Sequence, residues 1–324
     1  WWEGLDPQDL YTGRHFVPPE GIDSAAAMNA WHDAHDGQWI ETPPERDPHF
    51  TALWAARQRD LLDKYRPDLC YFDDTGLPLG QAGLEATAYH YNASLRWRGE
   101  LPVVNGKKLE PDQRRGITET VERGFSDTLR AEPWQTDTCI GDWHYNRARY
   151  TDHWYVPARS VVQRLVDVVS KNGCLLLNIP LRGDGSIDSD ERQILQDIAA
   201  WIRVNGEAIF ESRPWRVYGE GPTEVQAGMF GEGAQRPWTA QDVRFTTRAG
   251  ALYALPLDWP DGGDITVRAL GRGALNGASV ERVELLGGGT VAFSQADDAL
   301  SISPPDRRPV AYAPAFRILG RGLV

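Results

Sequence analysis

Two adjacent carboxylates, Asp73 and Asp74, end the segment in which residue types and their order point most directly to chemistry. The segment Lys64–Thr75 reads K-Y-R-P-D-L-C-Y-F-D-D-T, so a polar turn leads into the apolar run Leu69–Phe72. Such a run is typical of a buried strand in a parallel sheet. The carboxyl ends of these strands display catalytic side chains in α/β barrels, where a carboxylate serves as nucleophile or acid/base group. Alternatively, the two aspartates begin a solvated turn, which this segment alone slightly favours.

The elements around this segment alternate between helix and strand. Helical spacing runs from Phe50 to Tyr65 and ends before Pro67, and a capping box at Asp188 and Glu191 starts a later helix. Further helices are expected at 82–97 and 158–171, and further strands at 101–104 and 174–179, the last fully buried. Alternation from about 50 to 205 predicts a parallel α/β sheet or barrel.

The composition and the apolar pattern of the chain change after about residue 220. Gly and Pro dominate 219–237, which indicates a linker. Short runs with turn signals follow at 243–247, 252–257, 265–270, 280–286, 291–293, 300–303 and 316–319. This spacing is typical of an all-β sandwich. We therefore expect a catalytic domain over 1–222 and a β-sandwich domain over 236–324.

Composition and charge exclude several classes of function. A net charge of −12 and a pI near 5.1 argue against nucleic acid or an anionic membrane as a partner. The sequence has no apolar run of membrane-spanning length. Its three cysteines show no metal-ligand spacing, and Cys70 and Cys174 lie in apolar runs that predict core positions.

Several strings, taken together, resemble a known family. The longest are S-K-N-G-C-L-L-L-N-I-P-L-R-G-D-G-S-I (Ser170–Ile187) and W-I-R-V-N-G-E-A-I-F-E-S-R-P-W (Trp201–Trp215). Shorter ones are Tyr71-Phe72-Asp73, Pro133–Thr138 with Trp143-His144-Tyr145, and the pattern over Arg244–Leu255. In this order they resemble the α-L-fucosidases of glycoside hydrolase family 29.

The resemblance implies a (β/α) barrel-like catalytic domain followed by an all-β sandwich. It implies a retaining exo-glycosidase that removes terminal α-L-fucose from oligosaccharides or glycoconjugates through a covalent glycosyl-enzyme. Two carboxyl groups about 5–5.5 Å apart perform such a reaction, one as nucleophile and one as acid/base. The chemistry requires no cofactor and no metal. Secretion or a periplasmic location would suit an enzyme that degrades glycans.

Asp73 matches the family's nucleophile, as the Asp after Phe at a strand end. Glu122 lies twelve residues before Trp134, a spacing that resembles the acid/base segment in part of the family. Other members carry a Glu directly after the equivalent Trp, but Gln135 stands there and an amide cannot supply a catalytic proton. Glu132 and Glu119 remain rivals for the role, and without this context a solvated loop position suits all three glutamates.

The resemblance also implies residues that bind the sugar. Tyr71 stands where the family has Trp and would form part of the pocket wall. Trp134 could stack on the sugar or fill the core. Lys107 stands where the family tends to carry Arg, although an exposed Lys in a turn is the commoner case.

The sequence also lacks two segments of the family. The His-Trp-Gly and Lys-His-His-Asp-Gly segments of the family's first strands do not occur, so we expect the barrel to be incomplete in this chain. A second copy of the chain or an N-terminal segment would complete it. The alternatives are a non-catalytic carbohydrate-binding protein derived from a fucosidase, or a glycosidase for another sugar.

Overall fold

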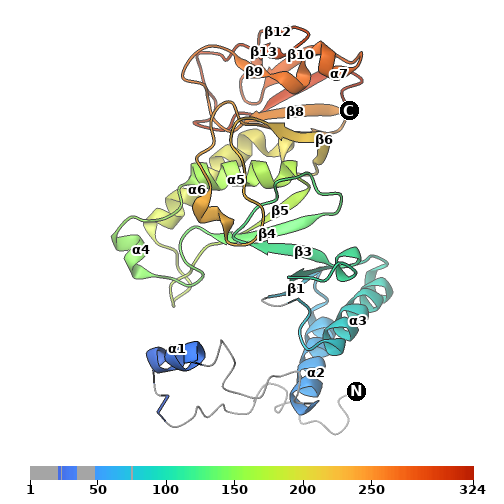
Figure 1. Ribbon diagram of the computed structural model, residues 1–324, viewed down its shortest axis with the longest axis vertical. Helices are drawn as coiled ribbons and strands as arrows, with labels where there is room; N and C mark the ends of the chain where they lie inside the picture. Colours follow the sequence, from blue (N-terminus) through green and yellow to red (C-terminus); the bar gives the residue numbers. More distant parts are fainter. Residues whose placement is uncertain (1–20, 23, 35–47, 74–75) are drawn as a thin grey trace. The chain divides into compact units, whose positions relative to one another are not determined.

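The computed structural model describes residues 21–22, 24–34, 48–73 and 76–324. They fall into two compact units, one ending at Thr118 and the other starting at Glu119. In Figure 1 the first unit holds helices α1 to α3 with strands β1 and β2, and the second holds the elements from β3 onward. Asp74 lies outside the described residues.

The first unit is built on two parallel strands and two long helices. Its elements are α1 (Ala25–Ala34), α2 (Pro48–Tyr65), β1 (Leu69–Phe72), α3 (Gln81–Arg98) and β2 (Val103–Lys107). β1 and β2 pair in parallel with Tyr71 beside Asn105, and α2 packs against α3. The predicted helix before Pro67 and the predicted strand before Asp73 are both confirmed.

A small apolar core joins these strands to the helices. It consists of Phe72, Leu77, Val104, Leu109 and Ile117, with Trp54, Cys70 and Tyr91 packed against it. Successive side chains of a strand point to opposite faces. Tyr71 and Asp73 therefore lie on the face of β1 away from this core, as do Asn105 and Lys107 on β2.

Three more parallel strands open the second unit. The elements are β3 (Thr118–Glu122), β4 (Trp134–Cys139), α4 (Arg147–Thr151), α5 (Ala158–Ser170), β5 (Gly173–Asn178) and α6 (Ser189–Asn205). β4 pairs with β3 on one side, which sets Glu122 beside Asp137, and with β5 on the other. The predicted capping box is present, since Asp188 and Glu191 bond each other's backbone N–H groups. The predicted parallel α/β architecture is confirmed.

Strand β5 is not fully buried, contrary to the sequence prediction. Leu175 and Leu177 pack against the core of the second unit, but Cys174 is exposed and Leu176 is 44% exposed. The reason is that α5 packs on the face of β5 that carries Leu175 and Leu177, which leaves Cys174 and Leu176 accessible on the other face. The prediction that Cys174 is a core residue is therefore wrong, and Cys70 is only partly buried.

The second unit continues into two antiparallel sheets, which confirms the predicted sandwich. The six-stranded sheet has the order β11-β10-β14-β8-β7-β6 and the three-stranded sheet has the order β12-β13-β9. The strands are β6 (Arg213–Glu220), β7 (Val243–Arg248), β8 (Ala251–Pro256), β9 (Ile265–Val267), β10 (Ser279–Leu285), β11 (Gly289–Thr290), β12 (Phe293–Gln295), β13 (Leu300–Ile302) and β14 (Phe316–Arg321), with a short helix α7 (Arg272–Leu275). β6 pairs with β7, so the larger sheet begins inside the segment 1–222 that the sequence assigns to the catalytic part. The boundaries 1–222 and 236–324 stay a prediction.

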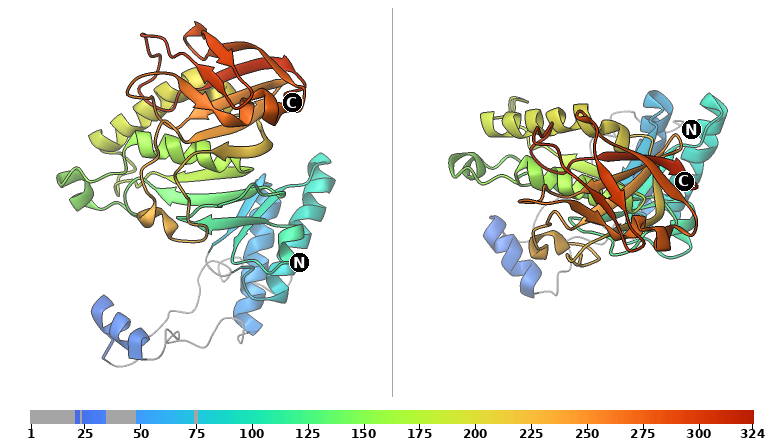
Figure 2. Two further views of the ribbon diagram at one scale, coloured as in Figure 1. Left: turned by 45° about the horizontal axis from the view of Figure 1, so that its top comes forward. Right: turned by 90° about the horizontal axis from the view of Figure 1, so that it is seen from above.

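Helix α5 joins the parallel strands to the sandwich. It contacts β5 and α6 as well as β6 and β7, and Figures 1 and 2 show it lying between the parallel and antiparallel strands. A second apolar core surrounds it, with Val161, Val162 and Val166 from the helix and Tyr253 and Leu255 from β8. The two kinds of sheet in this unit therefore share one core.

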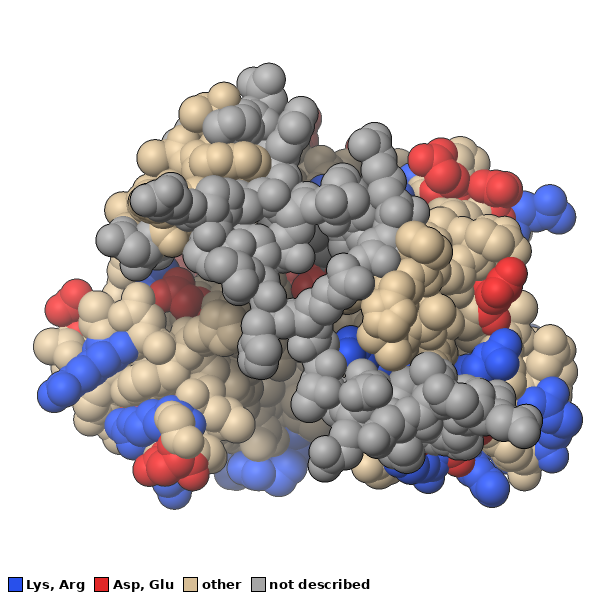
Figure 3. All heavy atoms as spheres, turned by 90° about the horizontal axis from the view of Figure 1, so that it is seen from below, with Lys and Arg blue, Asp and Glu red and all other residues tan. Residues whose placement is uncertain are grey.

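The described surface carries charges of both signs. Figure 3 shows basic and acidic side chains interspersed on the face in view. Among the described residues, no helix combines the length and the apolar character needed to cross a membrane.

A buried carboxylate on α5 holds two buried cations. Asp167 is 0% exposed and lies 2.8 Å from Lys171 Nζ and 2.7 Å from Arg244 Nε, which comes from β7. Both cations also face the ring of Tyr218, with Lys171 Nζ 4.7 Å from its centroid. Burial lowers the pKa of Lys171, and the charge of Asp167 opposes that shift. The aspartate and the aromatic ring together compensate two charges that water cannot reach.

We expect Asp167→Ala to lower the free energy of unfolding by about 3–5 kcal/mol, because it leaves two buried cations without their anion. Chemical denaturation measures this loss, and Asp261→Ala, which removes an exposed aspartate, serves as the control. A loss below about 1 kcal/mol, the usual value of an exposed ion pair, would contradict this role for Asp167.

Candidate active site

Three of the five predicted site residues lie together in the first unit. Lys107 Nζ lies 2.7 Å from Asp73 Oδ1, and the Tyr71 hydroxyl donates to the same oxygen over 3.3 Å. Lys107 Nζ also lies 5.9 Å from the centroid of the Tyr71 ring. Asp73 directly follows β1, and its side chain thus lies on the same face of the strand pair as those of Lys107 and Tyr71.

The two charged side chains of this site differ in burial. The Lys107 side chain is 4% exposed, whereas that of Asp73 is 71% exposed. A buried cation needs an anion close by, and Asp73 provides one. The carboxylate is therefore held from the protein side by Lys107 and Tyr71 and stays open to a ligand. This arrangement suits a nucleophile that must be charged and accessible.

The position of Lys107 differs from the commoner case that the sequence suggested. The triplet Asn105-Gly106-Lys107 reads as a turn, but all three residues belong to β2 and are buried. Gly106 leaves room for Leu109, since a Cβ there would lie 2.9 Å from Leu109 Cδ2. The strand thus continues through the glycine and brings the lysine to Asp73.

Glu122 is the last residue of β3, at the carboxyl end of a parallel strand of the second unit. A loop from far along the chain fixes its backbone, because Phe230 N–H donates to Glu122 O over 2.8 Å. Two further bonds, Glu232 N–H to Arg123 O and Gly228 N–H to Phe125 O, extend this pairing. The carboxylate of Glu122 is half-buried on the same strand face as Asp137.

The rival glutamates lie at the opposite end of the strands. Glu119 is near the start of β3, beside Trp134 in the strand register, and pairs with Arg130 over 2.8 Å. Glu132 is exposed in the turn that precedes β4. Catalytic groups of parallel α/β folds gather at the carboxyl ends of strands, so this geometry favours Glu122 over both rivals.

Trp134 fills the core, which is one of the two positions that the sequence left open for it. The residue is 1% exposed and packs with Val121 and Val168. Its indole N–H donates to Lys171 O over 3.0 Å. β4 turns this side chain toward α5, because Trp134 shares a strand face with Thr136, whose neighbour in register is the helix-facing Leu175.

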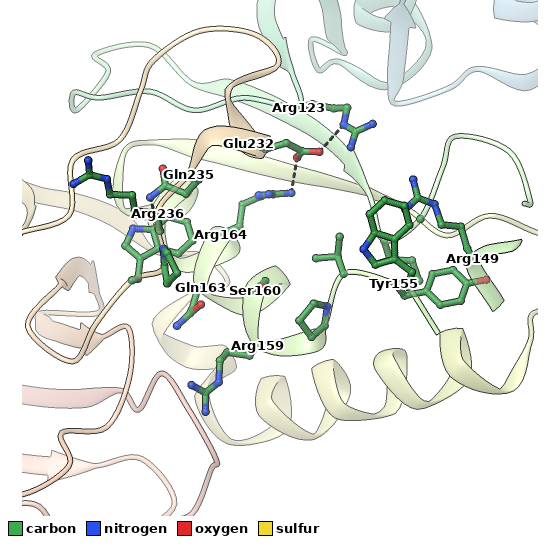
Figure 4. Close-up of a pocket in the computed structure, with 18 residues that line it drawn as sticks. Arg123, Arg149, Tyr155, Arg159, Ser160, Gln163, Arg164, Glu232, Gln235 and Arg236 are labelled. Atoms are coloured by element: carbon green, nitrogen blue, oxygen red, sulfur yellow. Dashed lines mark hydrogen bonds and ion pairs between the residues drawn. The ribbon is translucent and has the colours of Figure 1, made fainter. Parts of the chain in front are cut away.

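Sequence reasoning missed Glu232, the residue that ties the loop to the strands. Its carboxylate forms ion pairs with Arg123 and Arg164, the latter over 2.7 Å, and accepts a hydrogen bond from Thr138. Figure 4 shows it between the two guanidinium groups. The only signal in the sequence is one acidic residue in the linker string G-E-G, which is typical of any solvated turn.

Metal binding has no candidate in the part of the chain that the structure describes. No group of three or more His, Cys, Asp or Glu residues there has the arrangement to hold a metal ion.

Models of two families match the chain. The "Alpha-L-fucosidase" model matches residues 19–207, and the "Alpha-L-fucosidase C-terminal domain" model matches residues 235–319. Human tissue alpha-L-fucosidase is 25% identical over 277 residues, which cover 81% of this chain and 53% of that protein. The rat tissue enzyme is 27% identical over 220 residues, 65% of this chain and 42% of that one. This chain thus spans about half the length of the curated relatives it matches.

Solved structures show the same fold. The Thermotoga maritima alpha-fucosidase in complex with fucose aligns with a TM-score of 0.64 at 23% identity, over 84% of this chain and 57% of that one. A Bacteroides thetaiotaomicron alpha-L-fucosidase, trapped as a covalent intermediate, aligns with a TM-score of 0.62 at 17% identity, over 84% and 61%. Because the catalytic family model covers more than half of its residues, this chain belongs to the α-L-fucosidases of glycoside hydrolase family 29.

Proposed function

We propose that this chain carries the two catalytic carboxylates of a retaining α-L-fucosidase, with Asp73 as nucleophile and Glu122 as acid/base. The observation that carries the proposal is the Asp73 group, in which a carboxylate at a strand end is held by Lys107 and Tyr71 yet stays exposed. In this proposal the catalytic part extends to residue 222 and the sandwich covers 236–324. The substrate is a fucosylated oligosaccharide or glycoconjugate.

The proposed reaction has two steps. Asp73 attacks the anomeric carbon of fucose and forms a glycosyl ester while Glu122 gives a proton to the leaving oxygen. Glu122 then takes a proton from a water molecule whose oxygen attacks the anomeric carbon, which breaks the bond to Asp73, releases fucose and restores the Asp73 carboxylate. The covalent intermediate trapped in the Bacteroides thetaiotaomicron relative supports the first step.

Lys107 and Tyr71 act through Asp73 in this scheme. Lys107 Nζ and the Tyr71 hydroxyl both lie at Oδ1 of the carboxylate, so they orient the group that we assign to the attack. When the ester forms, Asp73 loses its charge, and a hydroxyl of the bound sugar would then accept a hydrogen bond from the ammonium group of Lys107.

Gly124 supports the assignment of Glu122, because it lets the loop reach the strand end. A Cβ on Gly124 would lie 1.9 Å from Gly228 O, a separation that no side chain tolerates. The loop bonds Glu122 and Arg123 through backbone groups, so its approach controls where the glutamate sits. This close contact is a positional requirement that only glycine meets.

Hydrolysis of an aryl α-L-fucoside tests the two carboxylates. We expect Asp73→Ala to lower turnover by about 10³-fold or more, with azide restoring it and giving a fucosyl azide of opposite anomeric configuration. Glu122→Ala should lower turnover by about 10²–10⁴-fold, and less for activated leaving groups. Glu132→Ala is the matched control.

The assay is run on this chain and on any longer chain that contains it, because its relatives are about twice as long. Absence of fucoside hydrolysis in both would overturn the proposal and favour a carbohydrate-binding protein. Hydrolysis of a galactoside in its place would point to a glycosidase for another sugar.

Lys107→Met should lower kcat/KM for the aryl fucoside by about 10–100-fold, since Asp73 loses the cation that stabilises and positions it. Lys108→Met removes a neighbouring exposed lysine and should stay within about twofold. Steady-state kinetics on both variants measure the difference. Equal kinetics for the two would remove Lys107 from the site.

Gly124→Ala should speed hydrogen exchange at the amides of Phe230 and Glu232 by about tenfold or more, because the added Cβ pushes the loop from β3. Hydrogen exchange with mass spectrometry on peptides spanning 226–236 reads this directly. Gly183→Ala is the control, since a Cβ at Gly183 meets no atom within 4 Å. Unchanged exchange in Gly124→Ala would mean that these bonds do not hold the loop.

A further inference from the structure

A cavity of about 650 Å³ opens in the second unit. Its wall comes from the start of α5, the connection between β4 and α5, and the loop 232–238, as Figure 4 shows. Small-molecule sites in proteins range over about 300–1,000 Å³, so this volume suits one or two sugar rings.

The wall is basic in a protein that is acidic as a whole. It contains five arginines and one carboxylate, whereas the chain has 34 basic and 46 acidic residues. The arginines are Arg123, Arg149, Arg159, Arg164 and Arg236. A net charge of −12 repels anions from most of the surface, so a basic cavity here needs a specific reason.

Ion pairs compensate only part of this charge. Glu232 serves both Arg123 and Arg164, while Arg149 pairs with Asp142 and Arg159 with Asp258. Five guanidinium groups thus face three carboxylates, an excess of two positive charges. Arg236, which is exposed at the wall, has no acidic partner among the described residues.

Two side-chain hydrogen-bond donors of the wall are left without a partner. Arg164 Nε and Trp238 Nε1 are buried and have no hydrogen-bond partner in the described part of the chain. Buried donors left unpaired cost free energy. Unpaired donors and an excess of positive charge favour a ligand rich in oxygen acceptors that carries negative charge, which guanidinium groups bind in a bidentate manner.

An aromatic side chain at the cavity indicates a sugar. Trp154 is 69% exposed, although indoles are usually buried, and it lines the cavity beside Arg149, whose guanidinium carbon is 4.0 Å from its ring centroid. An exposed indole face offers an apolar surface on which a sugar ring can stack. Stacking by Trp154 and charge from the arginines together fit an acidic sugar.

The cavity adjoins the end of β3, although Glu122 itself is not among the residues that line it. Arg123, in its wall, directly follows Glu122, and the loop that brings Glu232 is bonded to the backbone of both. A general acid lies on the leaving-group side of the bond it cleaves. A ligand in this cavity would therefore be a part of the substrate beyond the fucosyl bond.

We propose that this cavity binds an anionic sugar of the leaving group, one that carries a sulfate ester or a carboxylate, an inference that rests on the proposed fucosidase function for its place in the substrate. Acidic glycans would then be preferred over neutral ones. The site binds through side chains of the second unit and needs no fucose.

Isothermal titration calorimetry with three fucose-free probes tests the proposal: lactose, lactose 6′-sulfate and sialyllactose. We expect at least one acidic probe to bind about tenfold or more tightly than lactose. The double variant Arg159→Gln with Arg236→Gln should lose this preference, whereas Arg203→Gln with Arg307→Gln, which removes two exposed charges elsewhere, should keep it. Thermal unfolding verifies that both double variants are folded.

Each result of the titrations either supports or overturns the proposed site. Preference for the sulfated probe alone, or for the sialylated probe alone, supports the site and identifies the anion. Equal binding of all three probes, no binding of any, or equal loss in both double variants overturns the site. Because no probe contains fucose, these results are independent of whether the chain hydrolyses fucosides.

Discussion

The arrangement of the second unit depends on Asp167, a carboxylate buried between Lys171 and Arg244. Arg244 belongs to the sandwich, so this ion pair fixes α5 against β7. Lys171 lies just after α5, and its carbonyl accepts the indole N–H of Trp134 on β4. A single buried charge thus links the sandwich, the helix and the parallel strands, and β4 in turn sets the register of the strand that ends at Glu122.

The candidate catalytic groups are supported in two different ways. Asp73 is held by side chains of its own strand pair, within about 35 residues of sequence. Glu122 is held by backbone bonds to a loop more than 100 residues later. The first arrangement needs only local folding, whereas the second requires that the chain has passed through α6 and β6 and returned. The ion pairs of Glu232 with Arg123 and Arg164 then hold this loop in place.

Apolar periodicity predicted α2, α3, α5 and α6, together with β1, β5 and most of the sandwich, because in those elements burial is achieved largely by hydrophobic side chains. It did not predict β4, which reads W-Q-T-D-T-C and is buried throughout. Hydrogen bonds compensate its polar groups, as when Gln135 bonds Thr120 and Thr136 bonds Val121 O. Such partners lie about 15 residues away and leave no pattern in the sequence. Glu232 escaped detection for the same reason, and Cys174 was misplaced because an apolar strand need not be covered on both faces.

The loop that reaches Glu122 comes from the stretch between the two matched family segments, 19–207 and 235–319. Residues 208–234 would be treated as a connector if relatives were recombined at their domain boundaries. This stretch also contains Glu232, which forms ion pairs with Arg123 and Arg164 outside it. It contains Gly228 as well, whose carbonyl oxygen lies against Gly124. Exchange of the sandwich among fucosidases would therefore carry a piece of the catalytic neighbourhood with it. An exchange that keeps the Glu232 ion pairs with their own partners would have to treat residues 208–234 separately from the sandwich.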